Sequence, residues 1–181
     1  MTTPLLRRAV AADEAQIALV MRQSVLDLFP RFYDRRQSGS ASVHLTRPDM
    51  TLIEDGTLYV HEAAGEIVAC GGWSKRHKVY TGSGTQAGDT RLIDPRTEPA
   101  RVRAMFVRSD WTRRGLGRAI LETCEQAASD EGFRALTLMA TLPGVPLYRA
   151  FGFQVTEQVM VALPDGVLLE GVVMDRPIAL A

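Results

Sequence analysis

Two glycines and three arginines stand together where the sequence changes from strand periodicity to helix periodicity. They are Arg113, Arg114, Gly115, Gly117 and Arg118. Residues 102–107 are apolar and β-branched, which predicts a strand, and apolar residues recur at helical spacing from Leu116 onward. A helix N-terminus carries partial positive charge, so basic residues are unfavourable there unless a bound anion reverses the repulsion. Backbone N–H groups at a helix start bind anions, and glycines allow close approach. The pattern predicts an anion-binding turn; the alternative is a basic turn exposed to solvent.

Two nucleotide-binding loops do not fit this turn. A P-loop requires Gly-Lys-Ser/Thr after its glycines, and that tripeptide is absent. The dinucleotide fingerprint requires a third glycine where Ile120 stands. The sequence therefore opposes a nucleotide-binding module.

The elements that must position this turn alternate between strands and helices. Strands are predicted at residues 5–10, 58–62, 66–73, 102–107, 135–140, 159–163 and 167–174. Helices are predicted from Asp13 to Pro30, near 31–36, at 47–53 with a proline in the first turn, from 116 to a stop at 131–132, and within 143–153, with a loop at 38–42. Early strands pair as hairpins and later strands alternate with helices. This predicts an α+β fold with a mixed, mostly antiparallel central sheet of about seven strands and helices on both faces.

Two stretches of this pattern leave alternatives open. Residues 77–100 are irregular and are placed between the third and fourth strands, where so long a loop is either functional or a surface insertion. Gly71 and Gly72 indicate a bulge or the close approach of a ligand, and His61 is expected at the surface or as a satisfied core residue. No repeat or linker is apparent, so residues 1–181 are expected to form a single domain.

Composition narrows the class of protein. Of 181 residues, 46% are hydrophobic and the formal net charge is zero, which argues against nucleic-acid binding. Cys70 and Cys124 lie in apolar stretches and are expected to be buried thiols, since no Cys/His spacing suggests a metal site. The sequence lacks the apolar run of a signal peptide or membrane span, so a cytoplasmic protein without membrane contact is expected.

Two motifs together identify a family resemblance. The turn resembles the pyrophosphate loop of the GNAT superfamily of N-acetyltransferases, Arg/Gln-x-x-Gly-x-Gly/Ala, which falls on residues 112–117 with Thr112 at the Arg/Gln position. Residues 147–153 resemble the Tyr-x-x-x-Gly-Phe segment that follows the fifth strand in the same superfamily. Pro143 stands where members often carry an asparagine that touches the pantetheine arm.

The resemblance implies transfer of an acetyl group from acetyl-CoA to a primary amine, by direct attack in a ternary complex and without a metal. The backbone of Met105, Phe106 and Val107 would hydrogen-bond the pantetheine arm, and a backbone N–H near Val107 would polarise the thioester carbonyl. Tyr148 would be the general acid that protonates the leaving thiolate, and its alternative role is a core aromatic. The implied cofactor-binding residues are Met105, Phe106, Val107, Thr112, Arg113, Arg114, Gly115, Leu116, Gly117 and Arg118.

Several features stay open at this stage. The acceptor is expected to be a small-molecule or peptide amine, and a homodimer is kept as an option. The base that deprotonates the amine is not assigned, and water could link it to one of four carboxylates, Glu62, Glu66, Asp94 or Glu98. The competing class is a non-catalytic acyl-CoA-binding regulatory domain on the same fold.

Overall fold

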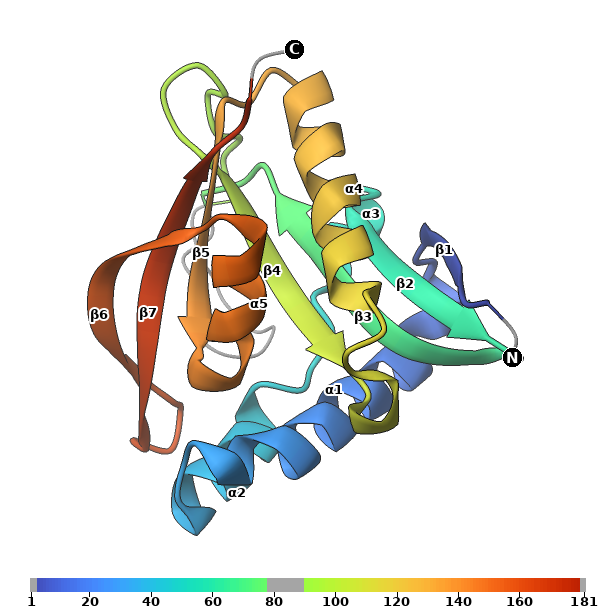
Figure 1. Cartoon of the computed structure of the whole chain (residues 1–181), viewed down its shortest axis with the longest axis vertical. Helices are drawn as coiled ribbons and strands as arrows, with labels where there is room; N and C mark the ends of the chain where they lie inside the picture. Colours follow the sequence, from blue (N-terminus) through green and yellow to red (C-terminus); the bar gives the residue numbers. More distant parts are fainter. Residues whose placement is uncertain (1–2, 78–89, 180–181) are drawn as a thin grey trace.

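The computed structural model describes residues 3–77 and 90–179 and contains a seven-stranded sheet (Figure 1). The strands are β1 (Leu5–Arg8), β2 (Leu58–Ala63), β3 (Glu66–Ser74), β4 (Ala100–Val107), β5 (Ala135–Thr141), β6 (Gln154–Ala162) and β7 (Leu168–Pro177). Their order across the sheet is β1-β2-β3-β4-β5-β7-β6. Within this sheet β4 and β5 run parallel and the other neighbours run antiparallel. The predicted mixed, mostly antiparallel sheet is confirmed.

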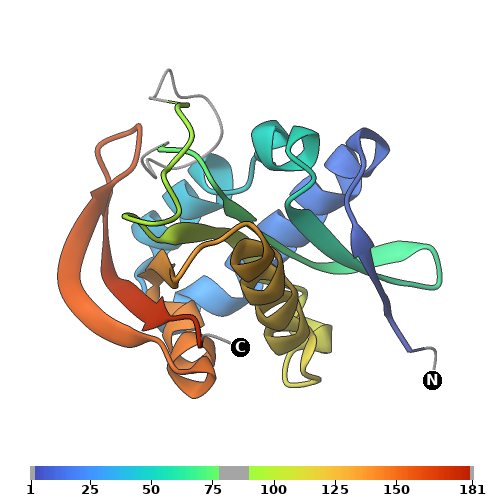
Figure 2. The same cartoon turned by 90° about the horizontal axis from the view of Figure 1, so that it is seen from above.

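Helices cover both faces of the sheet (Figure 2). They are α1 (Glu14–Leu28), α2 (Arg35–His44), α3 (Met50–Glu54), α4 (Leu116–Asp130) and α5 (Val145–Phe151). The first three lie on one face, and α4 and α5 lie on the other. Each face has its own apolar cluster: Trp73, Ile120 and Leu136 are fully buried on the α4 side, and Ile17 and Leu52 on the α1 side. Burying one such side chain contributes about 1.5–3 kcal/mol, so the two clusters hold the three layers together.

Residues 38–42 form part of α2, so the loop predicted there is wrong. A capping box starts this helix: the Gln37 N–H donates to Asp34 Oδ1 over 2.8 Å, and the Asp34 N–H donates to Gln37 Oε1 over 3.0 Å. The Ser40 hydroxyl also donates to Asp165 Oδ2 over 2.7 Å, which ties α2 to the turn between β6 and β7. Capping and packing outweigh the weak helix propensity of serine and glycine.

The predicted helix at 47–53 is present as α3, but its start differs. Asp49 is the N-cap, and its carboxylate accepts the Thr51 N–H over 3.1 Å. Pro48 therefore precedes the cap and does not lie in the first turn. This places the Asp49 carboxylate, which is buried, beside β4.

The irregular segment lies between β3 and β4, as predicted, and its two described ends pair through an antiparallel bridge between Arg76 and Leu92. Its middle, residues 78–89, lies outside the described residues. The expected bulge at Gly71–Gly72 is confirmed by a register shift in the β3–β4 pairing. A Cβ on Gly71 would lie 2.1 Å from Met105 Sδ, so the close approach there is by the protein itself. Strand β6 also begins five residues earlier than predicted, at Gln154.

Candidate active site

A cleft opens where β4 and β5 separate. Their pairing covers Ala100 with Leu136 and Arg101 with Thr137, after which the strands diverge (Figure 1). Ala104 has φ +56°, opposite the register shift in β3, and such a bulge bends its strand. The cleft has a volume of about 1210 Å³, which suits a large ligand.

Residues from opposite faces of the sheet line the two ends of this cleft. One end, here called the α4 end, consists of Thr112, Arg113, Gly115, Leu116, Gly117 and Arg118. The other, here called the arginine end, consists of Arg31, Arg47, Asp49, Arg101 and Arg103. Side chains alternate along β4: Val102 packs into the cluster beneath α4, so Arg101 and Arg103 face the layer of α1–α3.

The α4 end is built for an anion. Gly115 is the N-cap of α4 with φ +81°, a conformation that glycine adopts without steric cost. The Ala119 N–H donates to the Gly115 carbonyl over 3.0 Å, so the N–H groups of Leu116, Gly117 and Arg118 precede the helical ladder. These donors and the helix dipole favour negative charge.

The glycine at position 117 has a second reason to be small. A Cβ there would lie 2.8 Å from Leu147 Cδ2, so Gly117 also lets α5 approach the start of α4. Leu147 lines the cleft as well. A side chain at position 117 would therefore press on Leu147 of α5 as well as occupy the start of α4.

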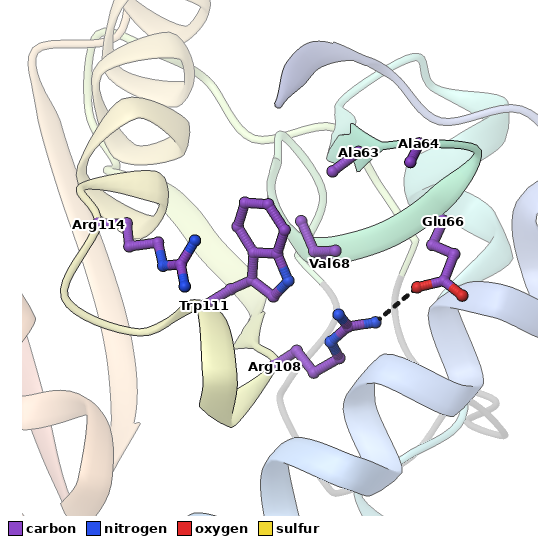
Figure 3. Close-up of a pocket in the computed structure, with 7 residues that line it drawn as sticks. All are labelled: Ala63, Ala64, Glu66, Val68, Arg108, Trp111 and Arg114. Atoms are coloured by element: carbon purple, nitrogen blue, oxygen red, sulfur yellow. Dashed lines mark hydrogen bonds and ion pairs between the residues drawn. The ribbon is translucent and has the colours of Figure 1, made fainter. Parts of the chain in front are cut away.

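The three arginines of the turn separate in space. Arg113 and Arg118 line the cleft, but Arg114 does not. Its guanidinium lies 4.5 Å from the ring centroid of Trp111, in a shallow pocket of about 260 Å³ that it shares with Arg108 and Glu66 (Figure 3). The Thr112 hydroxyl donates to the Ser109 carbonyl over 2.8 Å, so it stabilises the turn locally.

A buried histidine holds the start of α4, a role that sequence reasoning missed. His61 on β2 is 4% exposed, and its Nε2 lies 3.2 Å from the Leu116 carbonyl oxygen. A carbonyl can only accept, so Nε2 carries the proton in this contact. Burial lowers the pKa of His61, which keeps the ring neutral. The expectation of a satisfied core histidine fits this bond, although His61 Nδ1 is buried without a hydrogen-bond partner in the described residues.

The backbone of β4 presents N–H groups to the cleft. The Arg108 N–H donates to the Val68 carbonyl over 2.9 Å, so it points toward β3. Because successive N–H groups alternate along a strand, those of Val107 and Met105 point to the opposite edge. That edge faces the cleft, since β5 pairs with β4 only as far as Arg101. By the same alternation the Phe106 N–H faces β3, and its side chain packs toward α1.

Tyr148 lies on α5 at the cleft wall and is 8% exposed. Its ring meets Phe153 edge-on at 5.9 Å between centroids, which fixes its orientation. A Cβ on Gly144 would lie 2.7 Å from Tyr148 Cε2, so a glycine there leaves room for the ring. Pro143 and Gly144 line the cleft beside it. The tyrosine thus has both a core contact and access to the cleft.

The four carboxylates considered as bases do not line this cleft. Each is held by a basic partner: Glu62 by Arg7, Glu66 by Arg108, Asp94 by Arg96 and Glu98 by His77. Among the described cleft residues, Asp49 is the one carboxylate, and Arg103 Nη1 lies 3.3 Å from its Oδ2. Sequence reasoning missed Asp49 because the pairing joins residues that are far apart in the chain.

Two further findings concern the described part of the chain. Residues 3–77 and 90–179 contain no group of three or more His, Cys, Asp or Glu that could hold a metal ion. None of the helices formed by these residues has the length and apolar character needed to cross a membrane.

The cleft joins a separated β4–β5 pair to a helix start whose N–H groups and dipole favour an anion. The chain belongs to the Acetyltransferase (GNAT) family, whose model matches residues 22–153. It is thus an acetyl-CoA-dependent acetyltransferase, and the predicted family resemblance is confirmed.

Solved structures share this fold at low sequence identity. The GCN5-related N-acetyltransferase from Rhodopseudomonas palustris is 18% identical with a TM-score of 0.72, and the match covers 98% of this chain and 97% of that one. The acetyl-CoA complex of yncA from Salmonella typhimurium, a putative acetyltransferase, is 18% identical with a TM-score of 0.64, over 99% and 96%. The acetyl-CoA complex of a phosphinothricin acetyltransferase from Sinorhizobium meliloti is 21% identical with a TM-score of 0.65, over 99% and 90%. A comparison with curated protein sequences finds no match.

Proposed function

We propose that this protein transfers an acetyl group from acetyl-CoA to a primary amine, by direct attack of the amine nitrogen on the thioester carbonyl. The observation that carries the proposal is that one cleft joins an anion-binding helix start, a strand edge beyond the β5 pairing, and Tyr148. Acetyl-CoA supplies the activated acetyl group, and the residues of the cleft bind and orient it.

The α4 end would bind the pyrophosphate of acetyl-CoA. The backbone N–H groups of Leu116, Gly117 and Arg118 point out of the helix start, and Arg113 and Arg118 add positive charge beside them. Arg114 stacks on Trp111 and does not line the main cleft. We propose that it adds positive charge to the neighbouring shallow pocket.

The outer edge of β4 would bind the pantetheine arm and polarise the thioester. Val107 and Met105 have their N–H groups on that edge, and a donor aimed at a developing oxyanion stabilises the transition state. Phe106 would contribute its ring, which lines the cleft.

Tyr148 would complete the reaction as general acid. A bond forms between the amine nitrogen and the carbonyl carbon, the carbon–sulfur bond breaks, and the Tyr148 hydroxyl donates its proton to the departing thiolate. The Tyr148 phenolate then regains a proton from solvent, and the amine loses a proton to solvent, directly or through ordered water. We assign no side chain to that second step, since the four candidate carboxylates lie off the cleft.

The test is release of free CoA thiol from acetyl-CoA across a panel of amino acids, diamines, aminoglycosides and peptides, with identification of the N-acetyl product by mass spectrometry. Turnover with at least one amine, reduced strongly in Tyr148→Phe, supports the proposal. Tight acetyl-CoA binding without turnover on the whole panel would favour the non-catalytic regulator. We also propose that residues 1–181 act as one domain. Sedimentation of the full chain distinguishes a monomer from a homodimer.

A further inference from the structure

The arginine end of the cleft carries an excess of positive charge. It holds four arginines and one carboxylate. Arg103 and Asp49 form a close pair whose side chains are 10% and 12% exposed, so their charges offset each other. Arg31, Arg47 and Arg101 form no ion pair with a carboxylate among residues 3–77 and 90–179. The described residues therefore leave three positive charges in this part of the cleft without a paired carboxylate.

Of these three arginines, Arg101 gives the strongest support for an anion site. It lies on β4 at the last residue pair with β5, at the base of the divergence, and it faces the cleft. Its Nε is buried and has no hydrogen-bond partner within the described part of the protein. No hydrogen bond or ion pair among the described residues uses the Arg101 side chain, so its guanidinium is available to an anion in the cleft.

The surroundings strengthen the charge effect. Phe29, Phe32, Leu45 and Met139 line the same part of the cleft and are apolar. Electrostatic attraction is stronger beside apolar walls than in water, because the local dielectric constant is lower. An arginine fork also matches the two oxygens of a carboxylate or phosphonate.

We propose that the acceptor is a primary amine that also bears an anionic group, a carboxylate or a phosphonate, and that Arg101 binds this group with help from Arg31 and Arg47. This inference rests on the proposed function, because it assigns the arginine end to the acceptor. The same charges disfavour a second ammonium group, so diamines and polyamines are poor acceptors. They also favour the uncharged form of the reacting amine, since neighbouring positive charge lowers the pKa of an ammonium group.

The test compares acceptors that differ mainly in charge. The probes are α- and ω-amino acids, their carboxamides, aminoalkylphosphonates and 1,4-diaminobutane, assayed by thiol release at equal concentrations of uncharged amine. We expect the best carboxylate or phosphonate acceptor to exceed its neutral counterpart in kcat/KM by about ten- to a hundredfold, as a hydrogen-bonded charge pair allows. Arg101→Gln should abolish this preference through KM for the acceptor, with KM for acetyl-CoA unchanged.

Two further variants serve as controls for Arg101→Gln. Arg101→Lys keeps the charge and should keep the preference for anionic acceptors, at weaker affinity. Arg36→Gln removes an exposed arginine on α2 outside the cleft and should behave as wild type. A preference for neutral amines or diamines in the wild type, or equal losses on charged and neutral acceptors in Arg101→Gln, would overturn the inference.

A binding measurement separates this inference from the catalytic proposal. The same probes are added to the protein saturated with CoA, and the melting temperature is recorded. Anionic amines should raise it more than their carboxamides do, and the difference should vanish in Arg101→Gln. If this holds without any turnover, the catalytic proposal fails, and the arginine end is still a binding site for anionic amines. If turnover occurs but the shifts do not depend on ligand charge, the inference fails and the catalytic proposal stands.

Discussion

The two ends of the cleft are built in different ways. The α4 end comes from one short stretch of the chain and offers mainly backbone N–H groups, with Gly115 in the left-handed conformation at its centre. The arginine end is made of side chains from η2 (Phe29–Arg31), the α2–α3 connection and β4, which meet only when the sheet forms. A ligand feature common to a family can be bound by a short motif, whereas selectivity among acceptors depends on a tertiary arrangement. Substitutions should therefore separate acetyl-CoA binding from acceptor choice.

The largest expected effect falls between the two ends, at Tyr148. Tyr148→Phe keeps the ring and its contact with Phe153 but removes the proton donor. The turnover number should fall by roughly 10²–10⁴, the usual contribution of a positioned acid, with little change in KM for the amine. Steady-state thiol release measures this, and circular dichroism checks the fold.

A core role for Tyr148 predicts a different outcome. Tyr148→Phe would then turn over at the wild-type rate, and Tyr148→Ala would lower the free energy of unfolding by about 3–5 kcal/mol. A fully active Phe variant would remove Tyr148 from the mechanism and leave the cleft without an assigned acid.

Gly144→Ala should give the next largest effect, because it moves Tyr148 without changing it. The added Cβ would lie 2.7 Å from Tyr148 Cε2, and Gly144 has φ −82°, which alanine adopts easily. We expect roughly a tenfold or greater fall in turnover number, since small displacements of catalytic groups are costly, with acetyl-CoA affinity retained. Gly39→Ala is the matched control: its Cβ would meet nothing within 4 Å, so activity should be unchanged. A wild-type rate in Gly144→Ala would show that the placement of Tyr148 is not critical.

A substitution of His61 should give a smaller effect. It tests the contact that supports the start of α4. Burial lowers its pKa in the folded protein, so the unfolded chain takes up a proton first as the pH falls. The contribution of the neutral ring is thus complete above the ordinary histidine pKa of about 6.5 and is lost below it. His61→Gln can still donate to the Leu116 carbonyl but does not titrate, so its free energy of unfolding should depend less on pH in this range.

Chemical denaturation between about pH 5 and pH 8, around the ordinary histidine pKa, measures this difference. A His61→Gln profile that follows wild type throughout would contradict the assignment of a neutral, buried ring.

The sequence predicted the α4 end better than the arginine end, because the residues that form the α4 end are close together in the chain. Gly115, Gly117 and Tyr148 belong to short motifs, and the strand–turn–helix around them has clear periodicity. The pairing of Asp49 with Arg103 and the contact of His61 with Leu116 join residues about 55 positions apart, so only the strand order reveals them. The error at residues 38–42 was avoidable, because Asp34 and Gln37 have the spacing of a capping box. There the serine-rich composition was misleading.

Calorimetric binding of three related thioesters tests the account's central claim most directly, that the α4 end holds the phosphates of acetyl-CoA. They are acetyl-CoA, S-acetyl-4′-phosphopantetheine, which keeps one phosphate, and S-acetylpantetheine, which has none. We predict that acetyl-CoA binds about a hundredfold more tightly than S-acetylpantetheine, as one or two charge-assisted hydrogen bonds would allow, with the monophosphate between them. At one hundred times its dissociation constant, acetyl-CoA should stabilise the fold by about 2.7 kcal/mol.

The variants of Gly117 separate charge from packing in the same experiment. Gly117→Ala presses on the flexible end of Leu147 and should retain most of the affinity for acetyl-CoA. Gly117→Asp adds a negative charge at the helix start and should abolish the advantage of acetyl-CoA over S-acetylpantetheine. Equal dissociation constants for the three thioesters in the wild-type protein would contradict the account.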